Sequence, residues 1–215
     1  MKRAACFFTF LYMTASAWAE TPQTMDLSGG WKFKSEPAGP MPAWQRAWVA
    51  DTGWAVLDAG RCWEEQGFVG LDGFAWYRKE INVPVEWAGR PVWLILGAVN
   101  DAFNLYCNAQ PVNAFGDDSR HSVANIPSLA NLQPFLKPGR RNLLALRVYD
   151  WGGSGGIWQP PCLLTVDETV IDRFPLLFCH LATDANRIEA VLNLTQLGRN
   201  WDRCRVEFSL TEAAT

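Results

Sequence analysis

The residues best suited to recognition chemistry lie in one stretch, from Asn142 to Pro161. Asp150, Trp151 and Trp158 bracket a run, Gly152 to Gly156, in which four of five residues are glycine. Sugars are commonly held by an aromatic face beside a few polar groups that fix the hydroxyls. Glycine serves where φ is positive or where a ligand approaches the backbone closely. The stretch therefore predicts a substrate-binding site at Asp150, Trp151 and Trp158, and the alternative is a turn that Asp150 caps and a domain interface that Trp158 fills.

Catalytic residues are not expected in this chain. The paired carboxylates Glu64 and Glu65 are adjacent, and neighbouring residues on a strand point to opposite faces of the sheet, so they are a poor catalytic pair. The only histidines, His121 and His180, are far apart and lack a recognisable Ser or Cys nucleophile motif. No CxxC or histidine-rich spacing indicates a metal, and we expect no cofactor.

Short strands separated by turns are expected to position these residues. Leu144, Leu146 and Val148 alternate with less apolar residues, which is the period of a strand. Pro160 and Pro161 argue against a central strand after the glycines, because proline cannot donate to a ladder. Other expected elements are strands at 73–83, 91–97 and 102–107 and a wrapping loop at 40–60 with Trp54 buried. No long helical period follows Glu20, so an all-β sandwich is predicted.

The composition indicates a folded protein outside the cytoplasm. Hydrophobic residues make up 49% of the chain and the net charge is -3, so neither a nucleic acid nor a membrane is an expected partner. Residues 1–19 combine a basic start, an apolar run and Ala17-Trp18-Ala19, which is typical of a signal peptide. We therefore expect a periplasmic or secreted protein. Some of the five remaining cysteines could pair, but the odd number leaves at least one free: Cys62, Cys107, Cys162, Cys179 and Cys204.

Four landmarks in the chain resemble a known family. They are GFAWYRKEINVP at 73–84, VNDAFNLYCN at 99–108, LKPGRRNLLALRV at 136–148, and GGIW at 155–158. Their order is similar to that in the N-terminal sugar-binding domain of glycoside hydrolase family 2, the β-galactosidase, β-glucuronidase and β-mannosidase group. The resemblance implies a jelly-roll β-sandwich with a galactose-binding-like fold over residues 22–168. The chain departs from the family at Asn108-Ala109, where an Asn-Gly turn is usual.

The resemblance also suggests what the tail is. Residues 187–195 and 203–210 alternate as two strands of a hairpin. In the family an immunoglobulin-like domain comes next, so we expect 169–215 to be its first strands, an incomplete immunoglobulin-like sandwich in a truncated chain. The resemblance implies that both catalytic carboxylates belong to a third, barrel domain, which we do not expect within these 215 residues.

The sequence therefore favours a non-catalytic, carbohydrate-recognising module of a secreted family 2 glycosidase. Its expected partners are a β-linked glycoside and the immunoglobulin-like and barrel domains of the same enzyme. A free-standing secreted sugar-binding protein and a structural or interaction domain are the alternatives, and fold resemblance alone does not choose among them.

Overall fold

The computed structural model describes residues 24–116, 122–167, 177–181 and 188–192, with backbone only for the last two ranges. Its elements are strands and two short 3-10 helices: β1 (Thr24–Asp26), β2 (Trp31–Ser35), β3 (Ala55–Leu57), η1 (Glu64–Gln66), β4 (Gly73–Asn82), η2 (Val85–Trp87), β5 (Trp93–Asn100), β6 (Ala102–Cys107), β7 (Gln110–Phe115), β8 (Ser128–Asn131), β9 (Arg141–Asp150), β10 (Gly156–Thr165), β11 (Leu177–Leu181) and β12 (Ile188–Leu192). None of the helices among these residues is long and apolar enough to cross a membrane.

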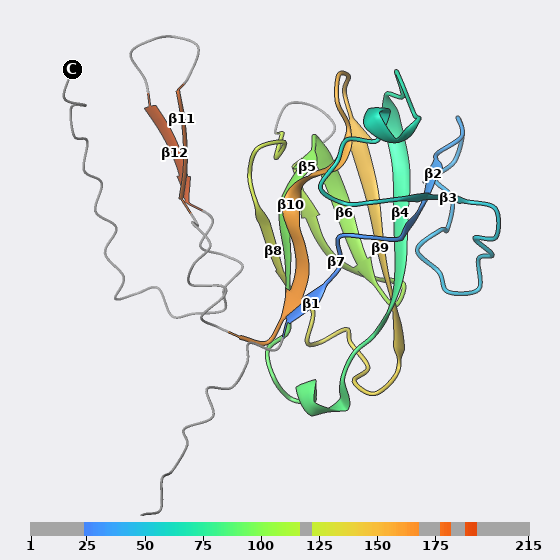
Figure 1. Ribbon diagram of the computed structural model, residues 1–215, viewed down its shortest axis with the longest axis vertical. Coiled ribbons are helices and arrows are strands. Elements are labelled where there is room, and N and C mark those ends of the chain that lie inside the picture. Colours follow the sequence, from blue (N-terminus) through green and yellow to red (C-terminus); the bar gives the residue numbers. More distant parts are fainter. Residues whose placement is uncertain (1–23, 117–121, 168–176, 182–187, 193–215) are drawn as a thin grey trace, which may run out of the picture.

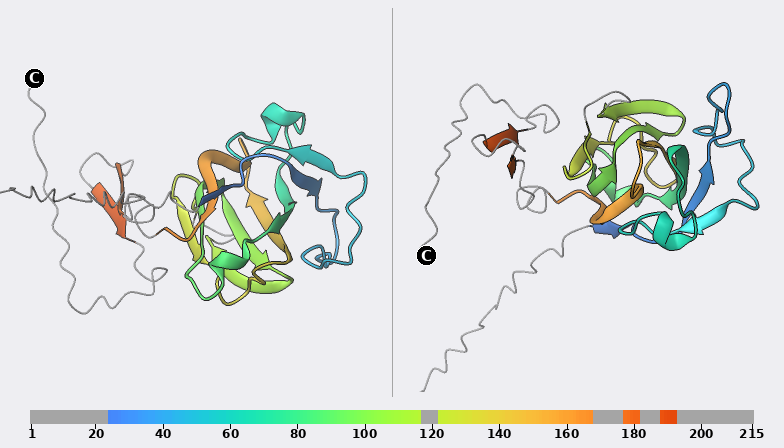
Figure 2. Two further views of the ribbon diagram at one scale, coloured as in Figure 1. Left: turned by 60° about the horizontal axis from the view of Figure 1, so that its bottom comes forward. Right: turned by 90° about the horizontal axis from the view of Figure 1, so that it is seen from above.

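Two antiparallel sheets form a sandwich (Figures 1 and 2). The smaller sheet has the order β1-β10-β5-β8, and the larger has the order β3-β2-β4-β9-β6-β7. The longest pairing joins β4 to β9 over ten residues in continuous register, from Gly73 opposite Asp150 to Asn82 opposite Arg141. The predicted all-β sandwich is confirmed.

The core lies between the sheets because each strand turns alternate side chains inward. On β9 these are Leu144, Leu146 and Val148, all fully buried, and on β4 they include Ala75 and Tyr77. The smaller sheet meets them with Leu94 and Leu96 of β5, among others. Burying an aliphatic side chain of this size stabilises a fold by roughly 1.5–3 kcal/mol, so this face is the main source of stability.

The strand after the glycines differs from its prediction. Pro160 and Pro161 lie in β10, which is a central strand between β1 and β5. The ladder tolerates them because its register with β5 shifts on either side of Gln159, which is the signature of a bulge. Gly97 of β5 faces this irregularity, and a Cβ at Gly97 would collide with the Pro160 carbonyl. The missing side chain on one strand thus makes room for the prolines of the other.

A second, smaller cluster covers the outer face of the larger sheet. The loop between β2 and β3 lies at one side of the molecule (Figure 1) and brings Trp44 and Trp54 against Trp76 of β4. The same loop contacts the buried guanidinium of Arg78. This group donates a hydrogen bond to the Val49 carbonyl at 2.9 Å and forms an ion pair with Asp51 at 3.2 Å. The wrapping loop and the burial of Trp54 are therefore confirmed.

The tail contains a strand pair that the sequence patterns did not predict. β12 falls inside the strand expected at 187–195, but it pairs with β11 at 177–181. The strand expected at 203–210, the signal peptide at 1–19 and His121 lie outside the described residues, as do the side chains of Cys179, His180 and Cys204.

The described cysteines are unpaired. Cys62 is half-buried, while Cys107 and Cys162 are buried in the sandwich. Burial raises the pKa of the Cys107 and Cys162 thiols to about 12. These two residues therefore act as small apolar core residues.

The β6–β7 turn keeps a conformation that usually selects glycine. Asn108 and Ala109 both have positive φ, 51° and 69°, which is typical of a two-residue type I′ hairpin. The Asn108 carboxamide donates to Asn142 Oδ1 at 2.8 Å and accepts from the Leu143 amide at 3.1 Å. These hydrogen bonds hold Asn108 in its left-handed conformation. Ala109 adopts the same conformation, in which its Cβ is sterically unfavourable.

Replacing Ala109 by glycine is expected to stabilise the protein. A non-glycine residue in the left-handed region costs about 1–2 kcal/mol, and the extra freedom of glycine in the unfolded chain takes back about 0.4–1 kcal/mol. We expect Ala109→Gly to raise the free energy of unfolding, measured by urea denaturation, by about 0.5–1 kcal/mol. Ala88→Gly is the control, because Ala88 has φ of -58° and should only lose stability. Equal losses in the two variants would contradict the strained turn.

Candidate functional site

The glycine loop connects β9 to β10 at the end of the sandwich where η1 also lies (Figure 1). Gly152, Gly153 and Gly156 have φ of 145°, 101° and 103°, values that side-chain-bearing residues rarely adopt. A Cβ at Gly155 would collide with Trp63, and one at Gly156 would come within 2.5 Å of the Tyr77 hydroxyl. The loop therefore needs its glycines for conformation and for close packing on buried aromatic residues.

Asp150 stabilises the loop through a hydrogen bond to its buried side chain. Its side chain is buried, and Asp150 Oδ1 accepts the Gly152 amide at 3.1 Å. Asp101 holds the next residue, because its Oδ2 accepts the Trp151 amide at 3.0 Å. The Asn100 side chain donates to the Ser154 carbonyl. Side chains outside the glycine run thus fix the backbone at Trp151, Gly152 and Ser154.

The two predicted tryptophans differ in exposure. Trp151 has 39% of its surface exposed and is one of the few large hydrophobic residues at the surface. Trp158 is half-buried, and its indole Nε1 donates to the Ala124 carbonyl at 2.8 Å. Of the three predicted residues, Trp151 alone offers a free aromatic face, while Asp150 and Trp158 hold the loop to its surroundings.

The adjacent carboxylates of Glu64 and Glu65 have different partners, as expected, but the two residues do not lie on a strand. Glu64 and Glu65 belong to η1, a correction to the expected geometry. Glu64 Oε2 accepts the Gly155 amide at 3.0 Å, whereas Glu65 is exposed and lies 3.6 Å from the Arg61 guanidinium. One carboxylate therefore supports the loop and the other faces solvent.

Burial perturbs the ionisation of Asp150. Loss of solvent raises its pKa to about 6, the Gly152 amide opposes the shift, and the carboxylates of Asp101, Glu64 and Asp72 add to it. Asp150 Oδ2 has no hydrogen-bond partner among the described residues. A buried oxygen of this kind favours the protonated carboxyl, because ionisation in a poorly solvated site is costly.

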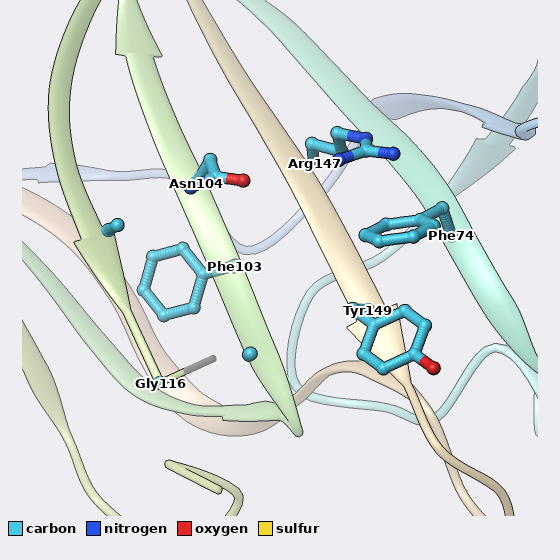
Figure 3. Close-up of a pocket in the computed structure, with 8 residues that line it drawn as sticks. Phe74, Phe103, Asn104, Gly116, Arg147 and Tyr149 are labelled. Carbon is cyan, nitrogen blue, oxygen red and sulfur yellow. The ribbon is translucent and has the colours of Figure 1, made fainter. Parts of the chain in front are cut away.

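A depression of about 280 Å³ lies on the outer face of the larger sheet, near the end of β9 that leads into the loop (Figure 3). Its lining comes from four neighbouring strands and the residue after β7: Phe74, Ala102, Phe103, Asn104, Ala114, Gly116, Arg147 and Tyr149. Strand pairing places Asn104 between Arg147 and Ala114, and Ala102 beside Tyr149. The hollow exists because long side chains on β4 and β9 stand next to short ones on β6 and β7.

The long side chains form a stack along one wall. The Phe74 and Tyr149 ring centroids are 4.4 Å apart, and the Arg147 guanidinium lies 3.5 Å from the Phe74 centroid. Glu36 fixes this guanidinium with two hydrogen bonds of 2.7 Å, to Nε and Nη2. The Trp76 indole donates to the same carboxylate at 2.6 Å, so the wall is tied to the covered part of the sheet.

The sequence patterns did not predict this hollow. Alternation along β4 and β9 assigns Phe74, Arg147 and Tyr149 to the face away from the core, and this was the available signal. The short residues opposite them become informative only when the register of β6, β7 and β9 is known. Among the described residues, no group of histidines, cysteines or carboxylates has the arrangement of a metal site.

Comparison with known proteins gives a family match and fold matches. A family model described as glycosyl hydrolases family 2, sugar binding domain, matches residues 64–167. A β-glucuronidase from Ruminococcus gnavus in complex with D-glucaro-d-lactam is similar at 18% identity with a TM-score of 0.57, over 69% of this chain and 30% of that one. A family 2 glycosyl hydrolase from Bacteroides cellulosilyticus DSM 14838 is similar at 16% identity with a TM-score of 0.55, over 66% and 20% of the two chains. At these identities the structures show the fold, and the chain spans less than a third of their length.

Asp150 is expected to make stability depend on pH. Because its pKa is raised from 3.8 to about 6, the folded state binds the proton more tightly than the unfolded state, and stability is lost as pH rises through this interval. Asp150→Asn keeps an oxygen acceptor for Gly152 but does not ionise. Between about pH 4 and 7 we expect the variant to gain stability relative to the parent protein, by up to about 3 kcal/mol.

Urea denaturation at several pH values measures this difference. Glu86→Gln, at an exposed position, is the control that should show no such trend. A difference between Asp150→Asn and the parent protein that does not change with pH would contradict the proposed proton linkage.

Proposed function

We propose that this chain, whose residues 64–167 match the family model of the sugar binding domain of glycosyl hydrolases family 2, is the non-catalytic, carbohydrate-recognising N-terminal module of a secreted glycoside hydrolase. Hydrolysis of the O-glycosyl bond then belongs to a barrel domain of the full-length enzyme. Residues 169–215 begin the immunoglobulin-like domain that links the two, and residues 1–19 direct the protein to the periplasm or outside the cell.

The observation that carries this proposal is the exposed Trp151 on a loop with a fixed backbone. Amides at Trp151, Gly152 and Gly155 are all held by buried or half-buried carboxylates. A rigid loop loses little conformational freedom when a ligand binds, which increases affinity for a given contact area. An indole face presented in this way suits the apolar face of a sugar ring.

The loop is proposed to contact a β-linked glycoside, with a division of labour among the three predicted residues. Trp151 supplies the contact surface. Asp150 acts on substrate recognition through the backbone of the glycines, and Trp158 acts through its bond to the segment that contains Ala124. This arrangement accounts for an aspartate and a tryptophan at the loop that do not themselves face solvent.

Calorimetric titration with β-linked oligosaccharides of galactose, glucuronic acid and mannose tests the proposal. We expect saturable heat with one of these classes and about tenfold weaker binding in Trp151→Ala, equivalent to about 1.4 kcal/mol. Trp48→Ala is the matched control, because Trp48 is 74% exposed on a different loop. Trp158→Ala should weaken binding through loss of loop order.

Two outcomes would contradict the proposed role of the loop. One is the absence of heat for every oligosaccharide from protein whose circular dichroism and cooperative unfolding show that it is folded. The other is equal loss of binding in Trp151→Ala and Trp48→Ala, which would point to a general effect of removing indoles.

A further inference from the structure

We propose that the hollow on the outer face of the larger sheet is a separate binding site for a neutral hexopyranoside, and that a single sugar ring fills it. The inference rests on the proposed carbohydrate recognition but concerns residues outside the glycine loop. It follows from the shape of the hollow, the polar groups that line it and its balance of charge (Figure 3).

The shape suits one ring. The volume of about 280 Å³ lies just below the range of ligand pockets, which span roughly 300–1,000 Å³. Ala102 and Ala114 contribute methyl groups to the lining, and Tyr149 and Phe74 form an aromatic wall beside them. A pyranose has apolar C–H faces and a rim of hydroxyls, so it can cover the methyl groups and lie against the aromatic wall at once.

Polar groups are available where the rim of such a ring would lie. The Asn104 carboxamide and the Tyr149 hydroxyl have no hydrogen-bond partner in the part of the chain that the structure describes, and both are half-buried. Arg147 uses Nε and Nη2 for Glu36, which leaves Nη1 outside that pairing. An amide that both donates and accepts, a hydroxyl and a guanidinium N–H match the donor and acceptor pairs of sugar hydroxyls.

The charge balance selects a neutral ring over an acidic one. Among the described residues that line the hollow, Arg147 alone is charged. Its bidentate partner Glu36 has a side chain only 6% exposed, so the pair is neutral as a unit and is held away from solvent. A uronic acid would bring a carboxylate to a site whose one cation is already paired. The cost of removing water from that carboxylate would therefore not be offset by an ion pair.

Matched methyl glycosides test the selectivity. Methyl β-glucopyranoside and methyl β-glucuronide differ only at C6, and methyl β-galactoside and β-mannoside complete the panel. We expect the full 215-residue chain to bind at least one neutral glycoside in calorimetric titration. It should bind the glucuronide no more tightly than the glucoside.

Variants within the hollow locate the site. Ala114→Phe places a ring over the exposed floor of the hollow and should abolish binding of the neutral glycoside. Asn104→Ala removes a side chain without a partner among the described residues, so it should weaken binding about fivefold without loss of stability. Glu36→Gln leaves Trp76 and Arg147 an oxygen acceptor but removes the compensating charge. It should shift the preference toward the glucuronide.

The outcomes separate this inference from the proposed role of the loop. Binding of a neutral methyl glycoside that is lost in Ala114→Phe and kept in Trp151→Ala supports the hollow. No binding of any neutral methyl glycoside to folded protein, insensitivity to both Ala114→Phe and Asn104→Ala, or tighter binding of the glucuronide overturns it. The response of oligosaccharide binding to Trp151→Ala decides the role of the loop independently, because Trp151 does not line the hollow.

Discussion

The ten-residue pairing of β4 with β9 is the constraint on which the rest of the structure depends. Because side chains of a strand alternate between its faces, one register fixes two surfaces at once. Leu144, Leu146 and Val148 enter the core, and the residues that alternate with them include Arg147 and Tyr149 on the outside. A slip by one residue would exchange the two sets, so the apolar core and the outer hollow specify each other.

The Glu36–Arg147 ion pair connects this sheet to the loop that wraps it. Burying two charges costs solvation, and the cost is offset only where hydrogen bonds satisfy the groups well. Here two bonds of 2.7 Å join the pair, and the Trp76 indole adds a third to the carboxylate. Residues that lie 111 positions apart are thereby fixed in one geometry. Removing either charge alone would leave the other poorly compensated, so the pair favours a single arrangement of the wall that includes Phe74.

Sequence patterns predicted the sandwich because the core repeats at every second residue. The alternation in β4 and β9 is of this kind, whereas the continuous apolar run of β5 marks a strand that is covered on both faces, and all three strands are present. Glu64 was placed on a strand because a three-residue 3-10 helix is too short to show a period of its own. The sequence does not predict Pro160 in a central strand, because proline lacks the backbone N–H that such a strand donates to its neighbour. That expectation takes no account of the residue on the facing strand. Gly97, 63 positions earlier, makes the exception possible, and only the pairing of β5 with β10 shows it.

The candidate sites were predictable to a different degree, because they depend on contacts between strands. Asp150, Trp151 and Trp158 stand out in the sequence beside the glycines, but Asp101 and Ala124, which bond to Trp151 and Trp158, are distant in the sequence. For the hollow, the sequence signal covers only the long side chains of β4 and β9, since alanine and asparagine are ordinary residues on an exposed strand. It arises where Ala102 meets Tyr149 and where Asn104 meets Arg147 across β6 and β9. The shape of the hollow therefore depends on the lengths of a few side chains on the outer face, and function is decided by such a site rather than by the fold that carries it.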